Sequence, residues 1–120
     1  MNYKILIIED EKRIRDSIIE FLEIYGYKVV GAENGEVGIR VAFEEKPDLI
    51  FCDMMMPVLD GMGVLKAINS STLAGTPFIF LTALAQTDES NTAMSLGADG
   101  YIFKPFKSKE LLEVIKKWLQ

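Results

Sequence analysis

Histidine is absent from this sequence of 120 residues, and Cys52 is its only cysteine. A single cysteine excludes an internal disulfide and is typical of proteins from reducing compartments. With no imidazole and one thiol, the chain lacks the nitrogen and sulfur ligands from which zinc sites are built. These absences leave oxygen atoms as the ligands of any metal site, and they favour a cytoplasmic location.

Long apolar runs and an excess of basic charge are missing as well. The first apolar run, Ile5–Ile8, has four residues, whereas a membrane span needs ~20 and a secretory signal needs a longer run with a small-residue cleavage site. The 13 basic residues are outnumbered by 18 acidic ones, which gives a net charge of -5. We therefore expect no membrane insertion and no direct nucleic-acid binding.

Short apolar runs alternate with helical patterns along the whole chain. The runs cover residues 5–8, 29–30, 49–52, 78–81 and 101–103. Most are continuous, as parallel strands covered on both faces are. Apolar residues recur at helical spacing over residues 14–25, 62–68 and 111–119. Consecutive strand–helix units predict one α/β domain over residues 1–120, with a doubly wound parallel sheet of five strands.

The segment Thr87–Leu96 is the weakest of the predicted helices. It has few apolar residues and contains threonine, serine and asparagine, which are mediocre helix formers. A two-state change costs least in a marginal element. We therefore expect conformational switching to involve this segment.

Polar side chains follow the carboxyl ends of the predicted strands. Glu9 and Asp10 follow the first strand, Asp53 the third, Thr82 the fourth and Lys104 the fifth. In open parallel sheets ligands bind outside these ends, so we expect the five side chains to converge. Neighbouring carboxylates repel one another and favour protonation or a bound cation. An all-oxygen, partly solvated site suits Mg²⁺ or Mn²⁺.

This set of residues is suited to phosphoryl transfer. A carboxylate that is ionised at neutral pH needs no general base to attack phosphorus. The Lys104 ammonium and the Thr82 hydroxyl would stabilise the phosphoryl oxygens. The product would be an acyl phosphate on Asp53. A chain without histidine cannot be its own phosphohistidine donor, so the donor must be another protein.

The chain resembles the response-regulator receiver domains of two-component signalling, the CheY-like family, over essentially its whole length. The matching segments are KILIIEDE, LIFCDMMMPVLDGMGVLK, FIFLTALA and GADGYIFKPF, in this order at strands one, three, four and five. The resemblance implies a flavodoxin-like strand order 2-1-3-4-5 with helices on both faces. It also implies a phosphoprotein that acts as a signalling switch and catalyses only its own phosphorylation and slow dephosphorylation.

The same resemblance assigns the metal ligands. Asp53 corresponds to the phosphoacceptor, Asp10 to a direct metal ligand, and Glu9 to an acid that acts partly through water. Met55 corresponds to the residue whose backbone carbonyl binds the metal. Met55 and Leu84 are apolar where some relatives carry polar side chains that orient an attacking water, so we expect the acyl phosphate to hydrolyse slowly.

The resemblance also assigns phosphoryl-binding and switching residues. Thr82 and Lys104 would bind the phosphoryl group, together with the backbone N–H of Ala83. The Lys104–Pro105 peptide bond is expected to be cis, and Tyr101 to be the aromatic residue that turns inward on activation. An aromatic side chain in a strand can also be core alone, and that interpretation of Tyr101 stays open.

The expected partners follow from the same family. A sensor histidine kinase or a histidine phosphotransfer protein would be the donor, and the surface of the fourth helix, fifth strand and fifth helix would control an unknown downstream protein or output domain. A homodimer is compatible with that surface.

Three other functions are compatible with parts of the sequence. A dehalogenase-like phosphohydrolase would carry its nucleophile after the first strand and an acid in place of Met55. A flavodoxin-like nucleotide-binding domain would need a glycine-rich loop after the first strand. A constitutive, unphosphorylated interaction domain remains an alternative.

Overall fold

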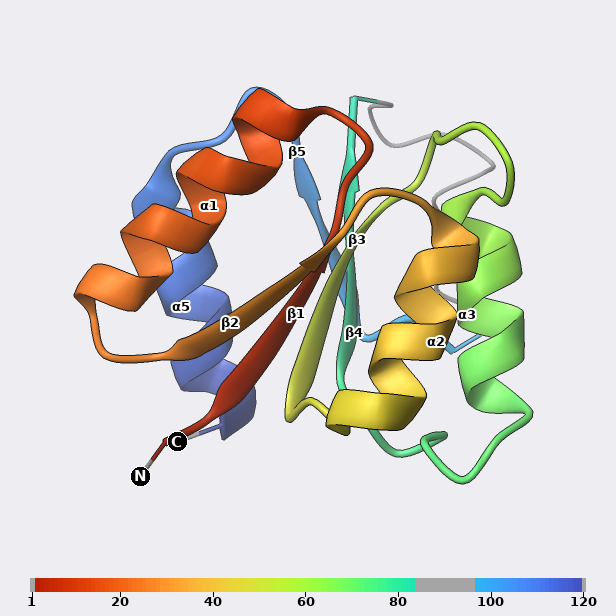
Figure 1. The fold of residues 1–120 in the computed structure, drawn as a ribbon. Coiled ribbons are helices and arrows are strands. Elements are labelled where there is room, and N and C mark those ends of the chain that lie inside the picture. The colour runs from red at the N-terminus through yellow and green to blue at the C-terminus, as the bar shows by residue number, and fades with distance from the viewer. Residues whose placement is uncertain (1, 84–96, 120) are drawn as a thin grey trace.

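The structure, a computed structural model, describes residues 2–83 and 97–119 (Figure 1). Residue Leu84 and the predicted weak helix Thr87–Leu96 lie outside the described residues. The described strands are β1 (Lys4–Ile8), β2 (Lys28–Ala32), β3 (Leu49–Asp53), β4 (Phe78–Thr82) and β5 (Gly100–Phe103). The described helices are α1 (Lys12–Ile24), α2 (Gly35–Glu45), α3 (Gly61–Asn69) and α5 (Ser108–Leu119). None of these helices has the length and apolar character needed to cross a membrane.

The five strands form one parallel sheet in the order β2-β1-β3-β4-β5. Helices α1 and α5 cover one face of the sheet and α2 and α3 cover the other (Figure 1). The predicted doubly wound sheet and its strand order are confirmed. The order reverses between β1 and β3, and ligands bind outside the carboxyl ends of strands at such a position.

The central strands explain why their apolar runs are continuous. Every residue of β3 and of β4 is buried. Alternate side chains enter opposite cores, so that Phe51 packs on the α1/α5 side while Ile50 packs on the α2/α3 side. Full burial of such a side chain stabilises the fold by about 1.5–3 kcal/mol. The buried strands therefore hold the polar residues that lie at their carboxyl ends.

Local signals set the helix boundaries. The Asn34 side chain accepts a hydrogen bond from Val37 N at 2.9 Å and begins α2, and Asp60 does the same for Gly63 N at the start of α3. Gly26, which follows α1, has a positive φ of 92°, as expected for a residue that ends a helix. The inclusion of Tyr25 in the apolar stripe of α1 was wrong. It is the C-terminal cap, and 58% of it is exposed.

Candidate functional site

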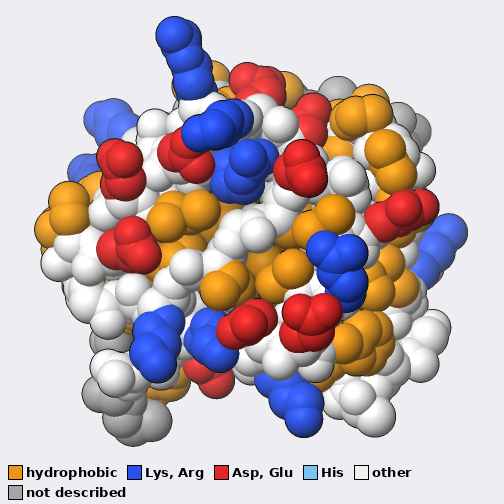
Figure 2. All heavy atoms as spheres, viewed as in Figure 1, with side chains coloured by type: hydrophobic (Ala, Val, Ile, Leu, Met, Phe, Trp, Pro, Cys, Tyr) orange, Lys and Arg blue, Asp and Glu red, His pale blue; other side chains and the backbone are white. Residues whose placement is uncertain are grey.

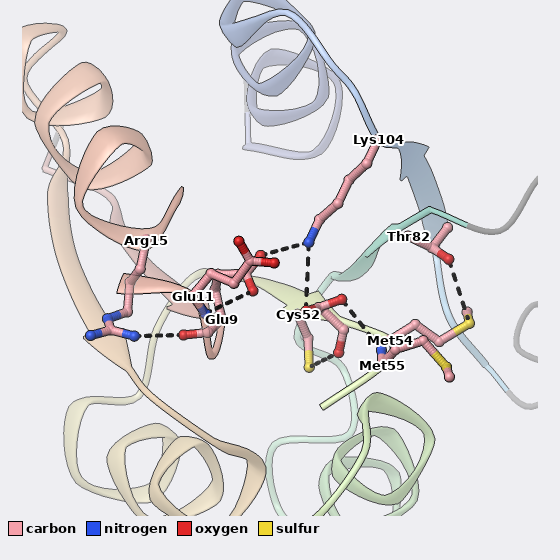
Figure 3. Close-up of polar contacts among 9 residues, drawn as sticks. Glu9, Glu11, Arg15, Cys52, Met54, Met55, Thr82 and Lys104 are labelled. Atoms are coloured by element: carbon pink, nitrogen blue, oxygen red, sulfur yellow. Dashed lines mark hydrogen bonds and ion pairs between the residues drawn. The ribbon is translucent and has the colours of Figure 1, made fainter. Parts of the chain in front are cut away.

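The ends of three strands bring an ion-paired cluster together. Asp53 is the last residue of β3, Glu9 follows β1 and Lys104 follows β5. The Lys104 Nζ lies 2.8 Å from Glu9 Oε1 and 3.5 Å from Asp53 Oδ2. Figure 3 shows Lys104 reaching down from β5 to Glu9. One ammonium thus contacts two carboxylates that lie 44 residues apart in the sequence.

Asp10 completes a group of three carboxylates. One oxygen from each of Glu9, Asp10 and Asp53 lies within 4.8 Å of the other two. Glu9 and Asp53 are buried and Asp10 is exposed. A hard divalent cation fits this donor set, because all donors are carboxylate oxygens and the exposed side leaves room for the waters that Mg²⁺ retains. These residues would hold the metal and the metal would offset their mutual repulsion.

Burial changes the acidity of the central carboxylate. Burial, and next the neighbouring Glu9 carboxylate, raise the pKa of Asp53, and Lys104 and the Met55 N–H offset part of the increase, so that the pKa goes from 3.8 to about 7. The expectation that Asp53 is already ionised at neutral pH therefore needs correction for the metal-free protein. A divalent cation bound beside Lys104 would favour the ionised form of Asp53 in this pocket.

Lys104 is held as a cation by its partners. Its burial alone would lower the pKa, but the hydrogen bond to Glu9 and the charges of Asp53 and Glu9 outweigh this effect, so the pKa of Lys104 is raised. Its side chain is only 19% exposed, which reduces solvent screening. Lys104 therefore carries a positive charge beside Asp53 at physiological pH.

The backbone around Asp53 is packed tightly against the start of α3. The Met55 N–H donates to Asp53 Oδ1 at 3.3 Å, and the Gly61 N–H donates to Met54 O at 2.9 Å. A Cβ on Gly61 would lie 2.5 Å from the backbone oxygen of Asp53. Only a residue without a side chain fits there. The Met55 side chain is 61% exposed, and metal binding by its backbone carbonyl stays a prediction.

The other predicted residues surround this cluster at different depths. Thr82, at the end of β4, is fully buried, and its hydroxyl lies 3.9 Å from Met54 Sδ (Figure 3). Ala83 is exposed. The Lys104–Pro105 peptide bond is cis. Phosphoryl binding by Thr82 and by the Ala83 N–H stays a prediction.

Tyr101 lies farther from the strand ends. It pairs in register with Phe80, two residues before Thr82. The tyrosine is half-buried, packs against the α2/α3-side core, and its ring centroid lies 4.9 Å from that of Phe103. In this structure Tyr101 is therefore part of the core margin, and its role as a switch stays a prediction.

An open apolar cavity of about 570 Å³ adjoins Lys104. Ile14 and Ile18 of α1 line one side, and Pro105 and Phe106 line the other. Ala83 also borders it, so the cavity runs from α1 to the end of β4. The cavity therefore adjoins the residue that pairs with Glu9 and Asp53.

Sequence reasoning missed Arg15. Its Nη1 donates to the backbone oxygen of Glu9 at 2.7 Å, and Figure 3 shows its side chain extended from α1 toward Glu9. The helical pattern predicts the Arg15 N–H bond to Glu11 O, found at 2.9 Å. The direction of the guanidinium depends on how α1 sits on the sheet, and no local pattern in the sequence reports that.

Comparison with known proteins agrees with the geometry. Residues 5–116 match the family described as the response regulator receiver domain. The probable transcriptional regulator ycf27 of Porphyridium aerugineum is 42% identical over 117 residues, which are 98% of this chain and 48% of that protein. The transcriptional regulatory protein DltR of Streptococcus agalactiae is 41% identical over 113 residues, 94% of this chain and 50% of that protein.

Solved structures agree as well. Chemotaxis protein CheY4 of Vibrio cholerae superposes with a TM-score of 0.93 at 29% identity, covering 99% of this chain and 100% of that one. A response regulator receiver domain from Clostridium thermocellum gives a TM-score of 0.91 at 34% identity, and the match covers 98% of this chain and 94% of that one. The chain belongs to the response regulator receiver domain family, because the family match covers residues 5–116. The parallel sheet of order 2-1-3-4-5, with acids, a threonine and a lysine at its strand ends, agrees with this membership. The chain spans about half the length of the curated relatives named above.

Proposed function

We propose that residues 1–120 act as one phosphorylation-controlled switch, in which Asp53 accepts a phosphoryl group from a phosphohistidine on another protein. The observation that carries this proposal is the Asp53 carboxylate at the centre of the site, with two acids within 4.8 Å and the Lys104 ammonium 3.5 Å away. A structural ion pair needs only one acid beside Lys104, whereas three acids meet here, and carboxylates this close to one another are unfavourable without a further cation.

The chemistry is a displacement at phosphorus. An oxygen of ionised Asp53 attacks, the bond between phosphorus and the imidazole nitrogen breaks, and its electron pair leaves with the donor histidine, which is then free to take up a proton. Lys104 stabilises the negative charge on the transferred group, and Thr82 supplies a hydroxyl at its edge. When bound by Glu9, Asp10 and Asp53, Mg²⁺ supplies positive charge to the phosphoryl oxygens.

The donor would bind at the apolar cavity between α1 and the segment after β5. Its walls are aliphatic and aromatic side chains such as Ile14, Ile18 and Phe106, and one end opens beside Lys104. An amphipathic helix that carried the phosphohistidine could bury its apolar face there. We therefore propose a histidine kinase or a histidine phosphotransfer protein as the partner.

The output surface would consist of β5, α5 and the fourth helix. A second cavity of about 500 Å³ opens on the described part of it, between Tyr101 and Phe103 of β5 and Val114 of α5. Phosphorylation would bias a two-state equilibrium there, and a shift from 1:99 to 99:1 needs about 5.5 kcal/mol. Charge-assisted bonds from Lys104 and Thr82 to the phosphoryl group could contribute much of this.

The signal would pass to another protein or to an output domain, since the named relatives are transcriptional regulators about twice as long. Direct nucleic-acid binding by these residues is not proposed, because acidic and basic side chains intermingle on the face shown in Figure 2 and the net charge is -5. The protein would thus work as a switch in the cytoplasm and not as an enzyme on other substrates.

The test is incubation with acetyl phosphate and Mg²⁺, followed by intact mass spectrometry. We expect the parent to gain one phosphoryl group and Asp53→Asn to gain none. A chelator should abolish the gain. Equal labelling of parent and variant would contradict the proposal.

A further inference from the structure

The short turn that carries the acids is attached to α1 at both ends by one residue. Arg15 Nη1 donates to Glu9 O at 2.7 Å, and the Arg15 backbone N–H donates to Glu11 O at 2.9 Å. Asp10 lies between these two attachment points. The Glu11 N–H in turn donates to Glu9 Oε2 at 3.3 Å. The conformation of the whole turn therefore depends on where Arg15 sits.

The main chain of Glu9 is fixed from two sides. Its N–H donates to Ala32 O of β2 at 3.0 Å, and its C=O accepts from Arg15. Its side chain bonds Lys104, which approaches from β5, away from Arg15 (Figure 3). Two cations thus hold Glu9: Lys104 binds the carboxylate and Arg15 binds the backbone.

The Arg15 side chain is packed and does not extend freely into solvent. A Cβ added to Gly31 of β2 would lie 3.2 Å from Arg15 Cδ, so the aliphatic part of Arg15 crosses the strand at a glycine. Among residues 2–83 and 97–119, none of the ion pairs involves Arg15. Its guanidinium donates to the neutral backbone carbonyl of Glu9.

We propose that Arg15 is a positioning residue for the divalent-cation site, holding the Glu9 carbonyl so that the Glu9 and Asp10 carboxylates face Asp53. This rests on the proposed function in that it concerns the same cation site. Arg15 touches neither the phosphoacceptor nor the phosphoryl group. Its effect would pass through the backbone of residues 9–11. A hydrogen bond with a charged donor is about twice as strong as a neutral one.

The direction of the effect separates positioning from charge. Removing a cation near an acidic cluster would, by electrostatics alone, strengthen its attraction for Mg²⁺. Loss of the attachment should weaken binding, because the turn must then be ordered when the cation binds. The two explanations predict changes of opposite sign in the dissociation constant.

The test compares Arg15→Met with Arg40→Met. Met replaces the length of the arginine without its donors. Arg40 undergoes the same change of net charge, but its side chain is 67% exposed on α2 and pairs with Glu44 at 3.8 Å instead of bonding the turn of residues 9–11. The Mg²⁺ dissociation constant is measured by calorimetry, and the melting temperature is measured in chelator. We expect about a tenfold weaker Mg²⁺ affinity for Arg15→Met, which corresponds to one such bond, and no change for Arg40→Met.

Phosphorylation by acetyl phosphate supplies a second readout. The Mg²⁺ concentration for half-maximal rate should rise for Arg15→Met, whereas the rate at saturating Mg²⁺ should stay close to that of the parent. Arg15→Lys, which keeps a charged donor, should recover most of the affinity. If Arg15→Met does not fold, Arg15→Gln is compared in its place. We expect the same increase in the Mg²⁺ dissociation constant and in the Mg²⁺ concentration for half-maximal rate.

Unchanged or tighter Mg²⁺ binding by the neutral variant would overturn the proposal, as would equal weakening by Arg40→Met. A lower melting temperature with unchanged affinity would assign Arg15 to stability alone and would also overturn it. Failure of the parent to become phosphorylated would contradict the proposed function, while the calorimetric comparison would still decide the role of Arg15.

Discussion

Without divalent cations, the stability of this protein is expected to fall as the pH rises from 4 to 8, and Asp53 should account for most of the fall. In the folded protein, burial and the neighbouring Glu9 carboxylate raise the pKa of Asp53 from 3.8 to about 7. Between these two values the folded state binds more protons than the unfolded state, so the free energy of unfolding decreases with pH. This loss of stability is complete once the pH exceeds the pKa of Asp53 in the folded protein.

The size of the effect follows from the same difference. Each pKa unit corresponds to 1.36 kcal/mol, so the shift to about 7 predicts a loss of up to about 4 kcal/mol. Asp16, whose pKa is lowered by its hydrogen bond to Lys12, changes stability in the opposite direction at lower pH. The comparison of parent with variant removes such common contributions.

Urea unfolding in chelator, followed by circular dichroism at several pH values, measures this loss. Asp53→Asn should be more stable than the parent at pH 8 and similar at pH 4, and Glu23→Gln, at an exposed position on α1, should follow the parent. Added Mg²⁺ should stabilise the parent at pH 8 but not Asp53→Asn. Parallel pH profiles for the parent and Asp53→Asn would refute the reasoning.

Three further variants test the surroundings of Asp53, the proposed phosphoacceptor. Lys104→Met leaves the fully buried Glu9 without its cation. We expect the free energy of unfolding, measured with urea, to fall by about 2 kcal/mol. Unchanged stability would contradict a stabilising role of this ion pair. Gly61→Ala places a Cβ 2.5 Å from a backbone oxygen, whereas Gly75→Ala meets nothing within 4 Å. Only the first should lower stability, by about 1–3 kcal/mol, and slow phosphorylation. Met55→Asn should speed hydrolysis of the acyl phosphate, because asparagine introduces a polar group that can orient water. The decay of the phosphorylated mass measures this rate. A half-life of seconds for the parent at neutral pH would already contradict the expected slow hydrolysis.

The strands could be predicted because their signal is local. Each residue of β3 is buried, so the apolar run ends where the polar edge begins, and Asp53 stands at that point. The same logic applies to Thr82 at the end of β4. The right-handed crossovers of a doubly wound sheet then follow from general rules on parallel sheets, whereas the strand order 2-1-3-4-5 is implied by the resemblance to the receiver-domain family.

Other features depend on contacts between distant segments. The raised pKa of Asp53 arises from its burial beside Glu9, and the depth of that pocket is not readable from the order of residues. The bond from Arg15 to Glu9 O depends on the angle of α1 against the sheet. Tyr25 continues the helical apolar rhythm but falls at the cap, where the helix leaves the core.

The most direct test of the account is to locate the phosphoryl group. After reaction with acetyl phosphate and Mg²⁺, borohydride reduces an aspartyl phosphate to homoserine, which peptide mass spectrometry identifies by position. We predict homoserine at position 53, dependent on Mg²⁺. Modification at another aspartate, or none at residue 53 under conditions in which the protein is folded and binds Mg²⁺, would contradict the account.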